Sequence, residues 1–338
     1  MIERVGKRTL RLTGRPYLIA HAAAVGKKEG EGPLGDRFDY VATDDRMGQK
    51  SWELAESALQ RNAINLAVHK AGLQKGEIDL ILAGDLLNQC TGSFLASVDS
   101  DTPYLGQYGA CSTMAQGLAL GSCLVESGAA QRLLAAASSH FCSAERQYRF
   151  PLAYGGQRTP TAQWTATAAG AVVLAGKGMS RLRMTHVLFG KMVELGVKDA
   201  NNMGAAMAPA AYDTISALLH DLGARPTDFD CIVTGDLGRV GADLLLTLLR
   251  TDGIDLSPVY SDCGSLLFGE AQDTHAGGSG CGCSAAVLCG PLLRDMQAGK
   301  IRRLVFAGTG AMMSPTTVQQ GQPIAGICHA AVIERSDA

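Results

Sequence analysis

A cysteine stands at a turn that leads into an uncharged segment, in the order Tyr108-Gly-Ala-Cys-Ser-Thr-Met114. The small residues before it permit a tight turn, and Ser112 or Thr113 can cap the following helix by accepting a backbone N–H. The helix predicted over Ala115–Gly128 is apolar on all sides and therefore belongs in the interior. Because the positive end of a helix macrodipole favours thiolate, Cys111 is a candidate nucleophile. The alternative is an inert core cysteine, since free cysteine is commonly buried.

A second set of candidate residues lies in the long connection between residues 143 and 167, which is rich in Arg, Tyr, Gly and Thr. A connection of this length inside a compact protein is usually functional. Arginine forks match carboxylates and tyrosine rings offer flat faces, so the segment predicts contact with a planar anion. The alternative is that the segment lies at a subunit interface. The candidates are Glu145, Arg146, Arg149 and Arg158, with Tyr148 and Tyr154 between them.

Further candidate residues follow predicted strands. Asp85 and Asp236 each come directly after an apolar strand and are candidates for pocket walls or metal oxygens, or else for caps of the next helix. His140 closes another strand, where it can bond a carboxylate or serve a structural role. The glycine-rich loop that contains Gly278 and Ser279 brings backbone N–H groups close enough to hold an anion.

Composition excludes several classes of protein. The chain has 338 residues, 46% of them hydrophobic, and a formal charge of −2, which gives no support for nucleic-acid binding. Ten cysteines without a signal peptide predict reduced thiols in a cytoplasm-like compartment, and Cys281-x-Cys283 is too weak a pattern for a metal site. The longest uncharged stretch, residues 102–125, contains proline and glycines and predicts a buried helix in a soluble protein. Membrane attachment would then come through partners.

An internal repeat indicates the architecture. Residues 72–86 and 223–237 share a helix stop, an acidic strand entry, an apolar strand and a Gly-Asp-Leu exit, at an offset of 151 residues (235 minus 84). The later turns and strands match at an offset of 171 (305 minus 134). Strands that alternate with helices predict parallel βαβ units, with two halves at residues 1–178 and 179–338. We expect the site between the halves, near the strand ends.

A duplicated α/β half with a cysteine turn on a buried central helix resembles the thiolase and ketoacyl synthase superfamily. That resemblance implies a five-layered α-β-α-β-α fold built from duplicated βαβαβ halves, with Cys111 at the position of the nucleophile. The superfamily's catalytic histidine falls at Gly235-Asp236, and its second histidine or asparagine falls near Ser279. Neither base is present in this chain. A thiol without a base is a poor acyl acceptor, so we expect a protein that is not an enzyme.

Over its whole length the chain more closely resembles the stage V sporulation protein AD family. The resemblance rests on long, ordered motifs: Gly32-Pro-Leu-Gly35, Leu82-Ala-Gly-Asp-Leu-Leu-Asn-Gln89, Gly109-Ala-Cys-Ser-Thr113, Ala137-Ser-Ser-His140, Ala144-Glu-Arg-Gln147, Tyr154-Gly-Gly-Gln157, Met207-Ala-Pro-Ala-Ala211, His275-Ala-Gly-Gly-Ser-Gly280 and Ser314-Pro-Thr316.

The family resemblance implies a function. It implies a soluble homodimer that binds dipicolinic acid, free or as its calcium chelate, and acts in uptake into the developing spore. The implied partners are membrane subunits of the same transport complex at the forespore inner membrane, with no cofactor, no metal of its own and no nucleic acid. Two rival hypotheses stay open at this point: an acyltransferase that uses Cys111 with His140 as a relocated base, and a scaffold that only recruits membrane subunits.

Overall fold

The strands of the two halves repeat one order in space. A computed structural model describes residues 1–74, 76–148 and 158–336 of the chain. Its main sheet runs β12-β11-β14-β15-β10-β3-β9-β7-β5-β6, so each half places its five strands in the order third, second, fourth, fifth, first. The strands of the first half are β3 (Tyr17–Val25), β5 (Leu80–Gly84), β6 (Tyr104–Gly106), β7 (Arg132–Ser139) and β9 (Ala168–Ala175). Those of the second are β10 (Leu182–Leu188), β11 (Cys231–Thr234), β12 (Tyr260–Asp262), β14 (Arg303–Met312) and β15 (Ala325–Arg335).

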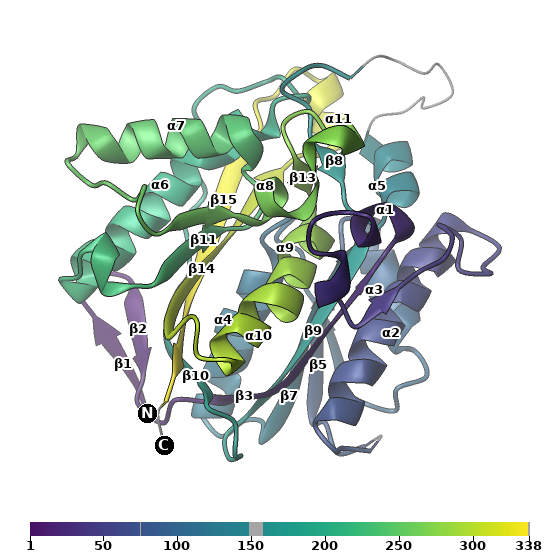
Figure 1. Ribbon diagram of the computed structural model, residues 1–338, viewed down its shortest axis with the longest axis vertical. Coiled ribbons are helices and arrows are strands. Elements are labelled where there is room, and N and C mark those ends of the chain that lie inside the picture. The colour runs from purple at the N-terminus through teal and green to yellow at the C-terminus, as the bar shows by residue number, and fades with distance from the viewer. Residues whose placement is uncertain (75, 149–157, 337–338) are drawn as a thin grey trace.

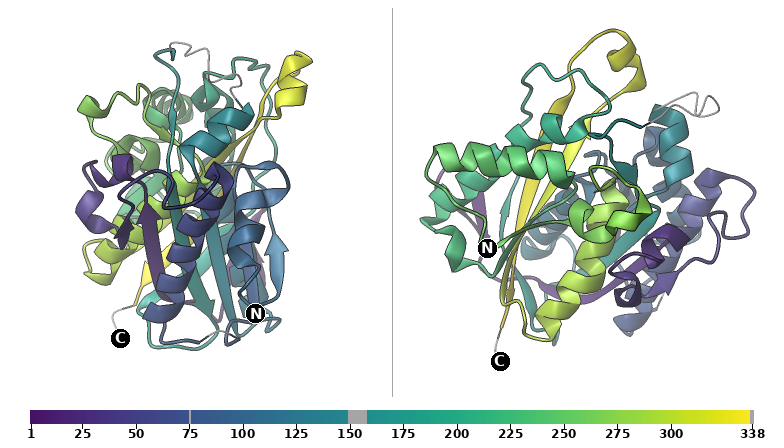
Figure 2. Two further views of the ribbon diagram at one scale, coloured as in Figure 1. Left: turned by 90° about the vertical axis from the view of Figure 1, so that its right-hand side faces the viewer. Right: turned by 45° about the horizontal axis from the view of Figure 1, so that its top comes forward.

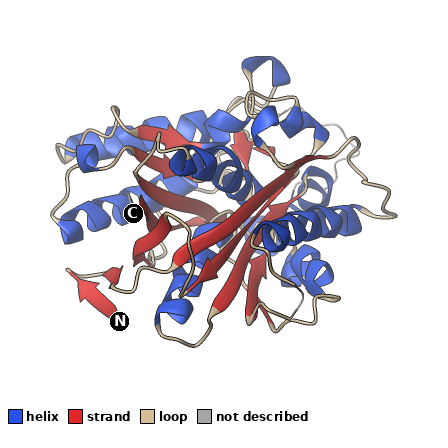
Figure 3. Cartoon of the chain, turned by 60° about the horizontal axis from the view of Figure 1, so that its bottom comes forward, coloured by secondary structure: helices blue, strands red, loops and turns tan. Residues whose placement is uncertain are grey.

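The two five-stranded sheets are joined at one corner, where Arg183 of β10 pairs with Tyr17 of β3. Helices α2 (Trp52–Lys70) and α3 (Thr91–Ser97) cover the outer side of the first sheet, and α6 (Met203–Leu222) and α7 (Gly238–Thr251) cover the second. Helices α4 (Thr113–Glu126) and α9 (Cys281–Val287) lie between the sheets. Figures 2 and 3 show these layers from other sides. The duplicated, thiolase-like α-β-α-β-α architecture predicted from the sequence is therefore confirmed.

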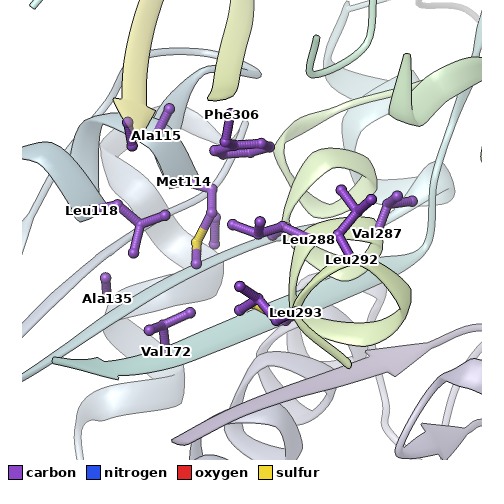
Figure 4. Packing of buried hydrophobic residues seen from close by; sticks show 14 of the residues in the cluster. Met114, Ala115, Leu118, Ala135, Val172, Val287, Leu288, Leu292, Leu293 and Phe306 are labelled. Carbon is purple, nitrogen blue, oxygen red and sulfur yellow. The ribbon is translucent and has the colours of Figure 1, made fainter. Parts of the chain in front are cut away.

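The central helix α4 packs against both sheets, as its apolar sequence predicts. Met114, Ala115 and Leu118 are fully buried among side chains from strands of both halves (Figure 4). Phe306 of β14 lies in the same cluster. A Cβ at Gly308 would lie 2.6 Å from the Ala115 Cβ, so only glycine lets β14 approach the helix this closely.

Two predicted helices differ from those observed. The sequence places Pro209 at the first position of a helix, whereas α6 begins six residues earlier, after the Asn202 cap, and keeps the proline inside it. The apolar sequence after the glycine loop predicts one helix over residues 284–297, but a wider turn at Leu288–Leu292, which contains Pro291, divides the observed helix. A proline lacks the N–H that a regular helix needs, so the winding changes there.

Shorter elements complete the described chain. Strands β1 and β2 form an antiparallel pair beside β10, and β8 and β13 form a small separate pair near the cysteine turn. No helix in the described residues has the length and apolarity to cross a membrane. The remaining bounds are β1 (Ile2–Val5), β2 (Thr9–Leu12), α1 (Lys27–Gly30), β4 (Tyr40–Val41), α5 (Phe141–Tyr148), β8 (Trp164–Thr165), α8 (Cys263–Leu267), β13 (Gly278–Ser279), α10 (Leu293–Gln297) and α11 (Pro315–Gln319).

Candidate functional site

The turn before Cys111 is tight and strained. Ala110 adopts a left-handed conformation with φ of 49°, which residues that carry a Cβ avoid. The predicted capping is wrong in its detail: the Ser112 hydroxyl donates to the Gly109 carbonyl (2.6 Å) and makes no cap bond. Thr113 instead accepts from the Gly109 N–H (3.1 Å). These hydroxyls close the turn on itself, so it holds Cys111 rigidly at the start of α4.

Cys111 is buried and faces a carboxylate from the other half of the chain. Its thiol lies beside the Asp236 carboxylate, which follows β11, and the two groups interact electrostatically. Burial raises the pKa of the Cys111 thiol well above its ordinary value, and the Asp236 charge raises it further. The expectation of a thiolate favoured by the helix end is therefore wrong. Desolvation and a neighbouring negative charge outweigh the macrodipole, whose effect is about 1 kcal/mol.

Asp236 accepts hydrogen bonds from the glycine loop, whose donors the sequence predicts to bind an anionic ligand. One carboxylate oxygen accepts from the Gly280 N–H (2.9 Å) and the Ser279 hydroxyl (3.3 Å), and the other accepts from the Thr309 hydroxyl (2.8 Å). Burial raises the Asp236 pKa to about 6, against the lowering effect of these bonds. At neutral pH the group therefore carries most of a negative charge beside the Cys111 thiol.

His140 is not placed to act as a relocated base for Cys111. Its Nε2 lies 2.8 Å from the Asp45 carbonyl oxygen, and its Nδ1 accepts from the Cys142 N–H (3.1 Å). The ring packs beside the Trp52 side chain at 5.5 Å between centroids. Both ring nitrogens are thus used within the surrounding structure, and burial lowers the His140 pKa. This geometry fits the structural alternative for His140.

A small cavity adjoins Cys111, and a larger one lies next to it. The inner cavity, of about 30 Å³, has room for little more than one water molecule. The outer cavity measures about 310 Å³, at the lower end of the size range of small-ligand pockets. Both are lined by Tyr108, Tyr148 and Met313. The inner lining adds Cys111, the polar residues Glu145, Thr165 and Ser279, and apolar residues such as Leu86 and Met203. The outer lining adds Leu87, Asn88, Gln89, Cys90, Met312, Ser314 and Pro315.

Two tyrosine hydroxyls stand at the boundary between these cavities. The hydroxyls of Tyr108 and Tyr148 lie 2.8 Å apart, and Tyr148 also donates to the Leu86 carbonyl. On the wall of the outer cavity, Gln89 and Cys90 adopt left-handed conformations in succession, with φ of 58° and 54°. Such strain costs on the order of 1–3 kcal/mol per residue and is commonly found at binding sites.

Asp85 is a structural carboxylate, which agrees with the capping alternative. It accepts from the Leu87 N–H (2.8 Å) and the Ser93 N–H (2.7 Å), the latter inside α3. Sequence reasoning missed its neighbour Glu56, a fully buried residue of α2 that accepts from the hydroxyls of Ser138 and Ser143. Burial and the Asp85 charge raise the Glu56 pKa to about 8.

The charged residues of the connection after β7 are spread over several places. Glu145 lines the inner cavity and accepts from the Thr165 hydroxyl (2.9 Å). Arg146 pairs with Glu53 and faces a third cavity, which shares Asn88 and Gln89 with the outer one. Arg158 lies over the Trp164 ring. Outside this connection, the carbonyl oxygen of Gly278 in β13 accepts a hydrogen bond from the Gln163 side chain. Arg149 and Tyr154 lie outside the described residues.

Thr309 is a site residue that the internal repeat contained but sequence reasoning overlooked. It lies 171 residues after Ser138 (309 minus 138), which is the offset of the later part of the repeat. Ser138 lies within β7 and Thr309 within β14, both fully buried, and each donates its hydroxyl to a buried carboxylate. Among the described residues, no group of three or more His, Cys, Asp or Glu side chains is arranged to hold a metal ion. All ten cysteines are free thiols.

Comparison with known proteins places this geometry in a family. The model of the family described as Stage V sporulation protein AD (SpoVAD) matches residues 6–334. The chain belongs to that family. Stage V sporulation protein AD of Bacillus subtilis (strain 168) is 42% identical over 331 residues, covering 98% of each chain.

Solved structures that resemble this family member support the fold alone. The 3-oxoacyl-[acyl-carrier-protein] synthase III from Aquifex aeolicus VF5 is 12% identical, with a TM-score of 0.55, over 94% of this chain and 99% of that one. Cerulenin-bound OleA from Xanthomonas campestris is 16% identical, with a TM-score of 0.59, over 98% of both chains. These condensing enzymes share the thiolase-like architecture that the sequence predicted.

Proposed function

We propose that this SpoVAD family member is a non-catalytic binding protein for dipicolinic acid, free or as its calcium chelate, and acts in uptake of that ligand into the developing spore. The observation that carries the proposal is the contact between Cys111 and Asp236. A carboxylate stands where a condensing enzyme needs a base that activates the thiol, and it suppresses the thiolate. The site therefore has a cavity beside Cys111, but the sulfur of Cys111 stays protonated and unreactive.

The outer cavity supports a ligand of this chemistry. Pyridine-2,6-dicarboxylate is a planar dianion that needs hydrogen-bond donors for its carboxylates and a flat surface for its ring. Asn88 and Gln89 bring side-chain amides, Ser314 brings a hydroxyl, and Tyr108 and Tyr148 bring aromatic rings. We place the ligand in this cavity, with one edge toward the two tyrosine hydroxyls. Calcium then enters as part of the ligand, which supplies three of its oxygen and nitrogen donors.

Titration calorimetry tests the binding proposal directly. We expect saturable heat with dipicolinate, measured both with a calcium chelator and with one equivalent of calcium. Benzoate, which has one carboxylate and no ring nitrogen, is the matched control ligand and should bind far more weakly. The absence of heat with dipicolinate at about millimolar concentration, under both conditions, would count against the proposal.

A second experiment tests the absence of catalysis. The protein is incubated with acyl-coenzyme A of several chain lengths, and its intact mass is measured. We expect no acyl adduct. An adduct that disappears in Cys111→Ser would instead support the acyltransferase hypothesis, with the thiol activated by a group other than His140.

We further propose that the protein acts as a homodimer in contact with membrane subunits of the same complex. Strand β6 is an edge of the main sheet, and Leu105 on it is 49% exposed. Phe94 and Val98, at the neighbouring helix α3, add exposed apolar surface. An exposed edge strand beside an apolar surface suits pairing with a second copy. Co-purification with the membrane subunits tests the proposed contact between this protein and those subunits.

A further inference from the structure

The end of the molecule opposite to the cavities carries basic side chains around a fully exposed methionine. The turn between β9 and β10 reads Gly176-Lys-Gly-Met-Ser-Arg181, and Met179 is 100% exposed. Lys177 and Arg181 are exposed on either side of it. No other large apolar side chain in the described residues is as exposed as Met179, so its whole surface is open to a partner. We call this surface, made of Arg15, Lys177, Met179, Arg181 and Arg183, the basic tip.

Contacts between three segments fix the basic tip in one place. The Arg183 guanidinium lies 3.2 Å from the centroid of the Tyr17 ring and donates to the Arg15 carbonyl (3.3 Å). Arg15 is exposed and adopts a left-handed conformation with φ of 52°, in a turn that presents it to solvent. The Arg181 carbonyl accepts from the Ser336 N–H (2.8 Å), so the end of β15 anchors the turn. The basic side chains therefore project from anchored backbone.

The positive charge of the basic tip is not balanced by ion pairs. Across residues 1–74, 76–148 and 158–336, no carboxylate lies within ion-pair distance of Arg15, Lys177 or Arg181. Two carboxylates on adjoining segments are already engaged. Glu126 accepts from the Gly14 N–H (2.8 Å) and the N-terminal ammonium, and Glu334 pairs with Arg303 (3.2 Å). This local excess stands out in a chain whose net charge is −2.

We propose that the basic tip binds an anionic lipid surface, with Met179 entering the headgroup region and the surrounding cations facing lipid phosphates. Basic residues close to an anionic leaflet each strengthen binding by roughly fivefold, and a single apolar side chain adds to that attraction. A protein partner is a weaker fit, because a stable protein interface buries about 800 Å² on each side around an apolar centre. One methionine on a turn offers no such centre.

This contact fixes how the protein faces the membrane. Strand β7 runs from Arg132, paired with Ala175 beside the basic tip, to Ser139 near the glycine loop and Cys111. Both termini of the chain lie at the end of the molecule where β10 begins (Figures 1 and 2). The ligand cavities are at the far end of these strands, so they would open away from the lipid surface. The proposal does not depend on which ligand the cavities hold.

Vesicle flotation of the purified full chain tests the proposal. We expect binding to phosphatidylglycerol vesicles at about 50 mM NaCl, little binding to phosphatidylcholine vesicles, and release at about 500 mM NaCl. The triple variant Arg15→Glu, Lys177→Glu and Arg181→Glu should lose binding by roughly 100-fold. Met179→Asp alone should weaken it severalfold.

A matched control separates local contact from overall charge. Reversing Lys50, Lys198 and Arg239, three exposed cations on other segments, changes the net charge by the same amount and should leave flotation within about twofold. Circular dichroism and dipicolinate titration of each variant show whether the fold and the cavities are intact. Equal loss in both triple variants, or no flotation with phosphatidylglycerol at low salt, would overturn the proposal. Binding only to an acidic polypeptide such as polyglutamate, and not to vesicles, would overturn it in favour of a protein partner.

Discussion

The Cys111 thiol lies beside the Asp236 carboxylate across the boundary between the two halves of the chain. Cys111 begins the central helix of the first half, whereas Asp236 follows a strand of the second. The pair therefore exists only when the halves are packed together. Burial and the neighbouring carboxylate keep the sulfur protonated as a thiol.

Replacing Asp236 with asparagine should make Cys111 more acidic. The substitution removes the negative charge that opposes thiolate formation, so the thiol pKa should fall, although burial still holds it above the ordinary value. The measurement is the rate of alkylation of the peptide that contains Cys111, followed by mass spectrometry as a function of pH. In Asp236→Asn, the alkylation rate of Cys111 should begin to rise at a lower pH than in the unmodified protein. A profile identical to that of the unmodified protein would mean that burial alone controls the thiol.

Stability should fall as the pH rises, because of Glu56. Its folded-state pKa of about 8 lies above the unfolded value of 4.5, so the folded protein binds the proton more tightly. The stabilisation is therefore fully present below about pH 4.5 and is lost as the pH rises toward 8. We expect the free energy of unfolding in urea to decrease by on the order of 4 kcal/mol across this interval, beyond the effects of other groups.

Glu56→Gln supplies the matched variant for that pH profile. Its amide oxygen can accept from one of the Ser138 and Ser143 hydroxyls and its NH2 can donate to the other, but the side chain no longer titrates. The variant should lose part of the decrease in stability between about pH 5 and pH 8. If its unfolding free energies run parallel to those of the unmodified protein, other buried acids such as Glu29, whose pKa burial raises to about 7, govern the profile.

Sequence reasoning predicted the framework of the site better than its chemistry. The apolar runs Tyr17–Val25 and Ala168–Ala175 predict strands with the bounds that β3 and β9 have, and the central helix predicted over Ala115–Gly128 is correct within two residues. Those features are local. The partner of Cys111 is not local, because residue 236 reaches residue 111 only through the packing of two separately folded units. The amides of the glycine loop are expected from sequence to hold a ligand anion, whereas the Gly280 N–H donates to the Asp236 carboxylate of the protein itself.

Charge distribution was also beyond the reach of the sequence pattern. The run of Glu and Arg after β7 predicted one binding cluster, whereas Glu145 turns to the inner cavity and Arg146 turns outward to Glu53. Neighbours on a helix point in different directions, so a short charged run rarely lines one pocket. The basic tip shows the converse, since Arg15 and Arg181 are brought together only by strand pairing.

Tyr108→Phe should weaken dipicolinate binding. The substitution removes one hydroxyl from the boundary of the two cavities while Tyr148 keeps its bond to the Leu86 carbonyl. Loss of one hydrogen bond to a charged ligand is worth roughly 2 kcal/mol, so we expect calorimetry to show about a tenfold or greater increase in Kd. Tyr104→Phe is the control, because the Tyr104 hydroxyl is buried outside both cavities. Equal effects of the two substitutions would argue against the placement of the ligand.

Charges on the exposed edge should separate the proposed homodimer. The double variant Val98→Asp and Leu105→Arg places two charges on a surface that is 69% and 49% exposed at these residues in the single chain, so its monomer should remain folded. Light scattering after size exclusion should report a dimer for the unmodified protein and a monomer for the variant. Leu195→Asp, at a comparably exposed position on another segment, is the control. A monomer in the unmodified protein would remove the dimer from the proposal.

Ala110→Gly should stabilise the protein, although it adds a glycine. Ala110 has φ of 49°, where a Cβ costs about 1 kcal/mol, and glycine adopts that conformation freely. Part of the gain is offset by the greater freedom of glycine in the unfolded chain, so the net increase in unfolding free energy should be about 0.5 kcal/mol. Ala119→Gly, within α4 and fully buried, should do the opposite by about 1 kcal/mol or more, because it loses helix propensity and packing. Urea denaturation of both variants measures the difference. A loss of stability in Ala110→Gly would show that the methyl group of this turn contributes more through its buried contacts than it costs in backbone strain.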